Sequence, residues 1–258
     1  MIPKTIHYTW FSGEAFPHKI QSCIDSWRTH LSDYHYKLWD YEAIKNIDSI
    51  YLKEALAEKK WAYAADFVRL YAIYHEGGIY LDTDVFVYKS FDSLLNCKAF
   101  IGKENSIHFE GGISSQYLGS HCFGAEKGHP FIKACLDYYD QRHFITSYHT
   151  YLPQPLKFNY VLLPYIQAEI ARQLGYEWNP SNQTKQKCKN GLDIFPSISF
   201  DPVQKNDSSF CRHLALGGWR IDKPVEPNYN LRYKIEWRLM TIVKWILHKA
   251  GYETLKID

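Results

Sequence analysis

"GGIYLDTDVFVY", residues 77–88, is an apolar run that opens with two glycines and carries two aspartates in its middle. The run predicts a buried strand, and Asp82 and Asp84 fall where that strand leaves the core. Side chains two residues apart on a strand point to the same side, so both carboxylates are expected to face one ligand. In open α/β sheets, ligands bind beyond the carboxyl ends of the strands, which is where this pair falls.

Strands and helices alternate on the N-terminal side of this run. Residues 4–11 and 34–40 alternate as strands do, and residues 18–31 carry apolar side chains at helical spacing. Residues 50–76 predict one helix, which the glycine pair ends. The order strand, helix, strand, helix, strand predicts an α/β sheet with parallel members.

The second half of the chain is less regular. Helices are predicted near residues 130–140 and 160–174, with a final helix over about 229–250. Short strands are predicted around residues 193–200 and 210–215. No repeat or linker divides the sequence, so we expect one domain.

Composition bounds the class of protein. The 258 residues are 46% hydrophobic and 22% charged, which indicates a globular chain with a sizeable core. The net charge of +2 is too balanced for a nucleic-acid-binding protein. Aromatic residues make up 17% of the chain, which fits either an aromatic-rich core or stacking on sugars and bases. The predicted domain covers residues 1–258.

Cysteine usage and hydropathy bear on location. The six cysteines are scattered, without the spacing of a zinc site, which is typical of reduced thiols. The opening "MIPKTIHYTWF" lacks the apolar segment of a secretory signal, and no apolar run approaches about 18 residues. We therefore expect a cytoplasmic protein.

The aspartate pair alone permits several functions. Two carboxylates suit Mg²⁺ or Mn²⁺, which proteins usually share with substrate phosphates. The plainest alternative is a pair of solvated turn carboxylates. A phosphohydrolase of the haloacid dehalogenase type also uses a D-x-D motif. That motif follows the first strand in such enzymes and is joined by a later acidic cluster, a pattern this sequence lacks.

Four blocks of sequence narrow the choice. They are "IPKTIHYTWFSG" (2–13), "YAADFVRLYAIYHEGGIYLDTDV" (63–85), "CFGAEKGHPF" (122–131) and "RHLALGGWR" (212–220). Together they resemble glycosyltransferase family 32, which includes capsular polysaccharide transferases and fungal Golgi mannosyltransferases. More distantly, they are similar to the large clostridial toxin glucosyltransferases. The resemblance implies a GT-A-type fold, a Rossmann-like mixed sheet flanked by helices with extra C-terminal helices.

The resemblance also implies a metal site. Asp84 would bind Mn²⁺ or Mg²⁺ directly, and Asp82 would contact the donor ribose and a metal-bound water. His213 would be the third metal ligand, whereas a lone histidine is otherwise more often a hydrogen-bonded structural residue. Asp82 and Asp84 are therefore the predicted catalytic residues.

The helix before the glycines carries further candidates. Asp66 and Arg69 lie one helical turn apart, so they form either an exposed ion pair or a site on one helix face. By resemblance, they would hold the ribose and the donor sugar. Gly78 either helps to end the helix or lets the donor approach the backbone.

Two tryptophans complete the predicted donor site. Trp10 ends the first strand and is either a core residue or, by resemblance, a stacking platform for the nucleotide base. Backbone groups of its neighbours Tyr8 and Thr9 would read the base edge. Trp219 would donate its indole N–H to the diphosphate, although Gly218 stands where the family usually has a serine.

With the aspartate pair, the resemblance predicts a metal-dependent glycosyltransferase, and the family implies that it retains configuration and forms an α-linkage. The favoured donor is UDP-galactose or UDP-glucose rather than GDP-mannose. The expected acceptor is an oligosaccharide or lipid-linked glycan in capsule, exopolysaccharide or lipopolysaccharide biosynthesis. A catalytically inactive relative that binds nucleotide sugar or glycan is the alternative. Nucleic acid is not an expected partner.

The C-terminal segment, residues 229–258, combines apolar residues at helical spacing with six Lys or Arg residues. Two interpretations are open. The helix packs on the domain, or it lies at an anionic membrane surface and makes the enzyme peripheral at the inner face of the cytoplasmic membrane.

Overall fold

The computed structural model describes residues 1–258 except 106–107, 111–112, 149–156, 180 and 217–258. The main helices are α1 (His18–His30), α2 (Tyr41–Ile44), α3 (Ile50–Ala57), α4 (Trp61–Glu76), α5 (Pro130–Asp137), α7 (Leu163–Gln173) and α8 (Ser197–Phe200). The strands are β1 (Thr5–Thr9), β2 (His35–Trp39), β3 (Gly78–Leu81), β4 (Val85–Val87), β5 (Ala99–Lys103), β6 (His108–Glu110), β7 (Ile113–Ser115), β8 (Leu118–Ala125), β9 (Gln186–Lys187), β10 (Leu192–Phe195) and β11 (Cys211–His213).

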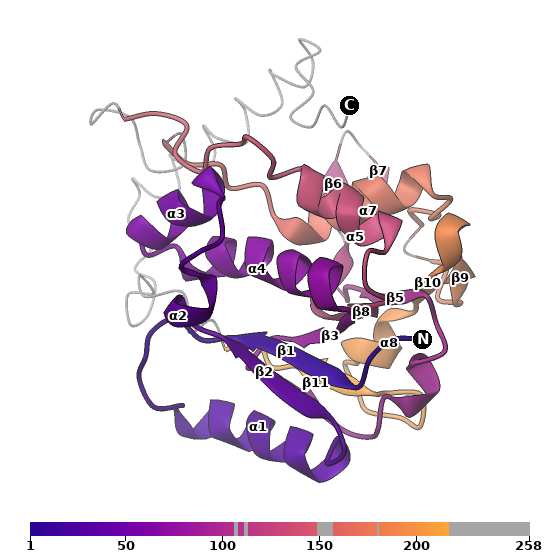
Figure 1. Cartoon of the computed structure of the whole chain (residues 1–258). Coiled ribbons are helices and arrows are strands. Elements are labelled where there is room, and N and C mark those ends of the chain that lie inside the picture. The colour runs from indigo at the N-terminus through magenta and orange to yellow at the C-terminus, as the bar shows by residue number, and fades with distance from the viewer. Residues whose placement is uncertain (106–107, 111–112, 149–156, 180, 217–258) are drawn as a thin grey trace, which may run out of the picture.

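Seven strands form one mixed sheet in the order β2-β1-β3-β8-β5-β10-β9. Strand β1 pairs in parallel with β2 and β3, whereas β8 runs antiparallel to both of its neighbours, β3 and β5. Helices α4, α5 and α7 cover one face of the sheet, and α1 lies on the other face (Figure 1). The predicted α/β class with a mixed, helix-flanked sheet is therefore confirmed.

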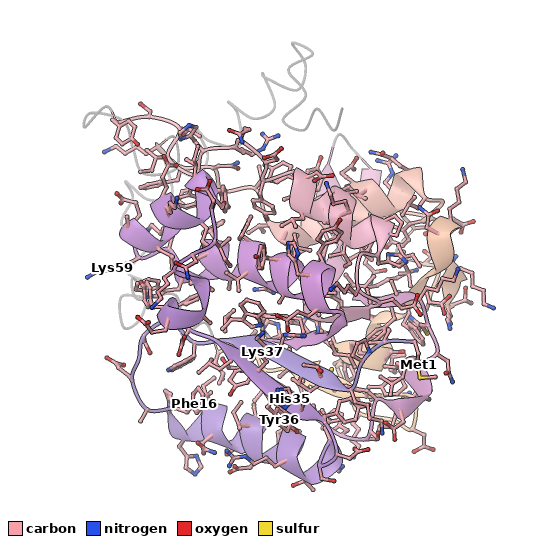
Figure 2. All side chains as sticks on the ribbon, viewed as in Figure 1. Met1, Phe16, His35, Tyr36, Lys37 and Lys59 are labelled. Carbon is pink, nitrogen blue, oxygen red and sulfur yellow. The ribbon has the colours of Figure 1, made fainter. Side chains whose placement is uncertain are left out.

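Strand β2 shows how side chains alternate between the two faces. Tyr36 stacks on Trp27 of α1, with ring centroids 6.5 Å apart. The next side chain, Lys37, points to the opposite face and pairs with Glu76 of α4 at 2.6 Å (Figure 2). The sheet therefore has a core on each face, one under α4 and α7 and one under α1.

A second, two-stranded sheet lies on the α1 side and consists of β4 paired antiparallel with β11. The indole N–H of Trp27 donates to the backbone oxygen of Val85 at 2.7 Å, which ties β4 to α1. Trp27 is fully buried, so this hydrogen bond lies in the core. The small sheet is thereby fixed against the main one.

Three predicted elements differ from the structure. The predicted helix 50–76 is two helices, because the chain turns at residues 58–60, where Lys59 adopts a φ of 54°. The predicted strand after the glycines is split into β3 and β4, which belong to different sheets. The stretch predicted as a strand at 193–200 is strand β10 followed by the short helix α8.

The C-terminal helix predicted over 229–250 lies outside the described residues. Within the part of the chain that the structure describes, none of the helices has the length and apolar character required to span a membrane. All six cysteines lie in the described part, and all are free thiols.

Gly78 is required by packing at the start of β3. Its φ is +110°, and a Cβ atom there would lie 2.7 Å from the Thr5 oxygen and 3.0 Å from His7 Nε2. His7 is buried, accepts a hydrogen bond from the Trp39 indole at Nδ1 and therefore donates from Nε2 to the Gly77 oxygen at 2.8 Å. The histidine occupies the space that a side chain at position 78 would need.

We predict that Gly78→Ala lowers the free energy of unfolding by more than the roughly 1–3 kcal/mol expected for backbone strain alone. The matched control is Gly175→Ala, since Gly175 has a similar φ of +102°, but a Cβ atom there would meet no neighbouring atom within 4 Å. Urea titration of both variants measures the difference. Equal losses would show that contact with the Thr5 oxygen and His7 contributes nothing.

Candidate donor and metal site

Asp82 and Asp84 lie in a tight turn that joins the two sheets, not in a strand. The Val85 N–H donates to the Asp82 oxygen at 3.0 Å, which closes the turn. The Asp82 N–H donates to the backbone oxygen of His121 on β8 at 2.9 Å. The expectation that the two carboxylates share one side of a strand is therefore wrong, and the turn, not the strand period, brings them together.

Strand β11 brings His213 to this turn. In the β4–β11 ladder His213 lies opposite Val85, and the Leu214 N–H donates to the Asp84 backbone oxygen at 3.0 Å. His213 Nε2 lies 3.2 Å from Asp84 Oδ1. One side-chain ligand atom from each of Asp82, Asp84 and His213 lies within 4.8 Å of the other two.

The Asp84–His213 pair is shifted in opposite directions. Burial alone would raise the pKa of Asp84, but the hydrogen bond and charge of His213 and the Leu216 N–H hold it below its usual value. Burial would likewise lower the pKa of His213, but the hydrogen bond and charge of Asp84 raise it instead. The pair therefore favours its ionised form.

Arg69 is the buried cation beside this turn. Its Nη2 lies 3.2 Å from Asp66 Oδ1 and 3.2 Å from Asp82 Oδ1. Nη1 donates to the Ser120 oxygen at 2.8 Å, and the guanidinium lies over the Tyr80 ring, 4.7 Å from its centroid. The side chains of Arg69 and Asp66 are only 6% and 10% exposed, so the alternative of an exposed ion pair is wrong.

Neighbouring groups hold Asp82 and change the pKa of Asp66. The Tyr80 hydroxyl donates to Asp82 Oδ1 at 3.0 Å and lies 3.0 Å from the Thr9 hydroxyl. Burial raises the pKa of Asp66 to about 6, outweighing the opposing effect of Arg69. Asp82 is thus held by Arg69 and Tyr80, whereas Asp84 is held by β11.

Trp10 lies just past the end of β1, at the same end of the sheet as Asp82, which follows the last residue of the neighbouring strand β3. Its indole N–H donates to the Glu14 oxygen at 2.7 Å, and its ring packs edge-on against Phe16 with centroids 5.0 Å apart. The ring is half-buried. Tyr8 packs edge-on against Trp27 of α1, with ring centroids 5.6 Å apart.

One predicted site residue is not brought to the cluster, and another is not described. Gly78 lies at the opposite end of β3 from Asp82, where its role is the packing against His7 described above. Trp219 and its neighbour Gly218 lie outside the described residues.

The sequence offered no sign of His121. This buried residue of β8 stacks its ring on His213, with centroids 4.8 Å apart and planes inclined by 12°. Burial, reinforced by the neighbouring His213, lowers the pKa of His121 to about 3, so its ring is neutral. Nothing in the residue pattern marks it, since it precedes the 122–131 block and contacts His213 only through the fold.

The three possible metal ligands, Asp82, Asp84 and His213, suit a divalent cation. Two carboxylates and one imidazole are ligand types that Mn²⁺ and related ions accept, and three protein ligands leave positions free for other oxygen atoms. The carboxylates are held by other groups before any ion arrives, which is the support that metal ligands usually have.

Part of the sequence that forms this site matches a known protein family. Residues 17–101 match the family described as "Glycosyltransferase sugar-binding region containing DXD motif". The match includes Asp66, Arg69, Asp82 and Asp84 but not Trp10 or His213.

Two fungal relatives are similar over half of the chain. Inositol phosphoceramide mannosyltransferase 3 of Schizosaccharomyces pombe is 35% identical over 139 residues, which are 51% of this chain and 35% of that protein. Mannosyl phosphorylinositol ceramide synthase SUR1 of Saccharomyces cerevisiae is 33% identical over 155 residues, covering 56% and 37%. The match thus spans little more than a third of either relative.

Among solved structures, PaToxG Glycosyltransferase aligns with a TM-score of 0.45 and 21% identity, covering 67% of this chain and 69% of that one. The family assignment comes from the sequence match instead, which falls on the residues that form the turn and its buried cation. The match of residues 17–101 to a glycosyltransferase sugar-binding region of the DXD type confirms the resemblance to glycosyltransferase family 32.

Proposed function

We propose that this protein is a metal-dependent glycosyltransferase that moves a hexose from a nucleoside diphosphate sugar to a glycan or lipid-linked acceptor. The observation that carries the proposal is the convergence of Asp82, Asp84 and His213 at the sheet edge, within the reach of one cation. A divalent cation bound there would neutralise the diphosphate and stabilise the charge on the leaving nucleoside diphosphate.

The protein's own groups prepare this reaction. Arg69 and Tyr80 hold Asp82, and the Leu216 N–H and His213 hold Asp84, so neither carboxylate has to be ordered when the donor binds. Trp10 offers a half-buried aromatic ring on the same edge for the base of the nucleotide. The family resemblance supports retention of configuration and an α-linkage.

Two lines of support point to different sugar donors. The sequence resemblance favours UDP-glucose or UDP-galactose, whereas the two relatives are named for transfer of mannose or mannosyl groups. We therefore propose a hexose donor, and a panel of UDP-glucose, UDP-galactose and GDP-mannose decides the base and the sugar. Differential thermal stabilisation in the presence of Mn²⁺ measures each choice.

We also propose a cytoplasmic setting, with the C-terminal segment 229–258 at the inner face of the membrane and a role in capsule or related polysaccharide synthesis. The free thiols of all six cysteines support a reducing compartment. The net positive charge of the segment supports contact with anionic lipid.

Asp84→Asn is the direct test of the proposed function. We expect release of nucleoside diphosphate from the donor to fall at least about a hundredfold, the scale of losing one group that stabilises developing charge. The amide keeps the size of the carboxylate, so the fold is expected to persist. Coupled detection of released UDP or GDP, with and without chelator, gives the rate.

Asp193→Asn is the matched control for this variant. Asp193 lies on β10 with its side chain 16% exposed, against 15% for Asp84, and it pairs with Lys185 at 2.8 Å. It should retain full activity. Binding of donor without release of nucleoside diphosphate by the unaltered protein would instead support the inactive relative.

Mn²⁺ affinity is expected to depend on His213. The imidazole must be neutral to bind a metal, and its pKa is raised, so protons compete already near neutral pH. Affinity should therefore fall as the pH drops from about 8 to about 6, by up to about tenfold per unit below that pKa. Because the pKa of Asp84 is lowered, that carboxylate stays ionised throughout. Isothermal titration at several pH values measures this, and His213→Gln should flatten the dependence.

Trp10→Ala is expected to weaken binding of UDP or GDP by about 1–3 kcal/mol, the scale of one base–aromatic stack. Trp178→Ala is the control, since Trp178 is also half-buried but packs between Tyr117 and Tyr165 away from the turn. Calorimetric titration with nucleotide and Mn²⁺ separates affinity from stability. If both variants lose stability and neither loses affinity, Trp10 is a core residue.

A further inference from the structure

His121 lies beside the proposed metal site, where its ring stacks on the ring of His213. Its side chain is buried on β8, and its ring is nearly parallel to that of His213 at 4.8 Å. Flat rings in such an offset stack restrict one another, because tilting either ring loses the contact.

The His121 ring is itself fixed from two sides. Its Nε2 donates to the backbone oxygen of Phe200 at 3.2 Å. At Gly119, a Cβ atom would lie 2.6 Å from His121 Cε1 and 3.0 Å from Nδ1, so any larger residue there would push the ring out of place. The imidazole therefore has one position available, and His213 stacks on a rigid surface.

The main chain of the same residue holds a second group of the site. The backbone oxygen of His121 accepts the Asp82 N–H at 2.9 Å, one residue beyond the end of β3. Through its ring and its carbonyl, His121 thus contacts two of the three proposed ligand residues without being a ligand itself.

We propose that His121 is a positioning residue that fixes the plane of the His213 imidazole, so that Nε2 faces Asp84 and the cation. This inference rests on the proposed metal-dependent function. A ligand held in its binding orientation loses less rotational freedom when the metal arrives, and groups that orient ligands in this way contribute strongly to metal affinity.

His121→Leu removes both the flat ring and the bond to Phe200. We expect the Mn²⁺ affinity of the folded protein, measured by isothermal titration without donor, to fall about tenfold or more. His121→Gln should recover most of that affinity, because its amide nitrogen reaches the position of Nε2 and keeps a planar group against His213. Gly119→Ala keeps the His121 imidazole but displaces it from its position against His213, and should therefore weaken Mn²⁺ binding as well.

His129→Leu is the matched control. His129 is as buried as His121 (4% against 5% exposed), and its Nε2 contacts the Asn190 backbone oxygen at 3.1 Å, but it caps α5 away from the turn. This variant should lose stability without losing Mn²⁺ affinity. Circular dichroism at the titration temperature establishes the folded fraction of each protein.

The outcomes separate the two proposals. If the unaltered protein binds no Mn²⁺, the metal-dependent function fails, and the positioning role fails with it. If the unaltered protein binds Mn²⁺ and the folded His121→Leu or Gly119→Ala protein binds it equally well, His121 is only a core residue and the proposed function stands. Should His121→Leu not fold, the Gln and Gly119→Ala variants decide the question.

Discussion

The antiparallel pairing of β4 with β11 is the constraint on which the site depends. Asp84 directly precedes β4, and His213 ends β11, so the ladder that places His213 opposite Val85 also sets the imidazole beside the carboxylate. The small sheet is anchored to α1 by the buried hydrogen bond of Trp27. The position of His213 thereby depends on α1, although the two lie far apart in the sequence.

Charge balance is the second constraint. Asp66, Asp82 and Asp84 lie close together, and Arg69 is the buried cation that contacts the first two. Removal of one partner from a buried ion pair usually costs about 3–5 kcal/mol, because the other charge is left without compensation. The three carboxylates still outnumber the fixed cation, Arg69. Asp84 contacts His213 instead. The arrangement accordingly favours a further positive charge at the turn.

Sequence patterns predicted the parts of this structure that depend on local order. Helix α1 follows from apolar positions at helical spacing, and its side chains Ile20, Cys23, Ile24 and Trp27 are all buried. The break at Lys59 was missed, because a left-handed residue other than glycine leaves no compositional sign. Strands β5 and β8 were not predicted either, since every residue in them is buried and the alternation of a half-exposed strand is absent.

The same division applies to the site. The aspartate pair was found from its own residues, whereas its contacts depend on pairings between distant strands, which no local pattern carries. A histidine within a buried strand, such as His121, has the same sequence signature whether it stacks on a ligand or fills the core.

The antiparallel direction of β8 explains how a strand in the middle of the sheet contributes backbone groups to the site at the carboxyl end of β3. Strand β3 ends at Leu81, which pairs with Cys122, so the preceding residues of β8 continue past the end of their neighbour. Their backbone oxygens are then available to other groups: Ser120 accepts from Arg69, and His121 accepts from the Asp82 N–H. A parallel strand at this position would approach the same edge with its C-terminal end and leave toward a connecting loop. The antiparallel strand instead passes through the edge as rigid backbone, and this holds both the buried cation and the turn in place.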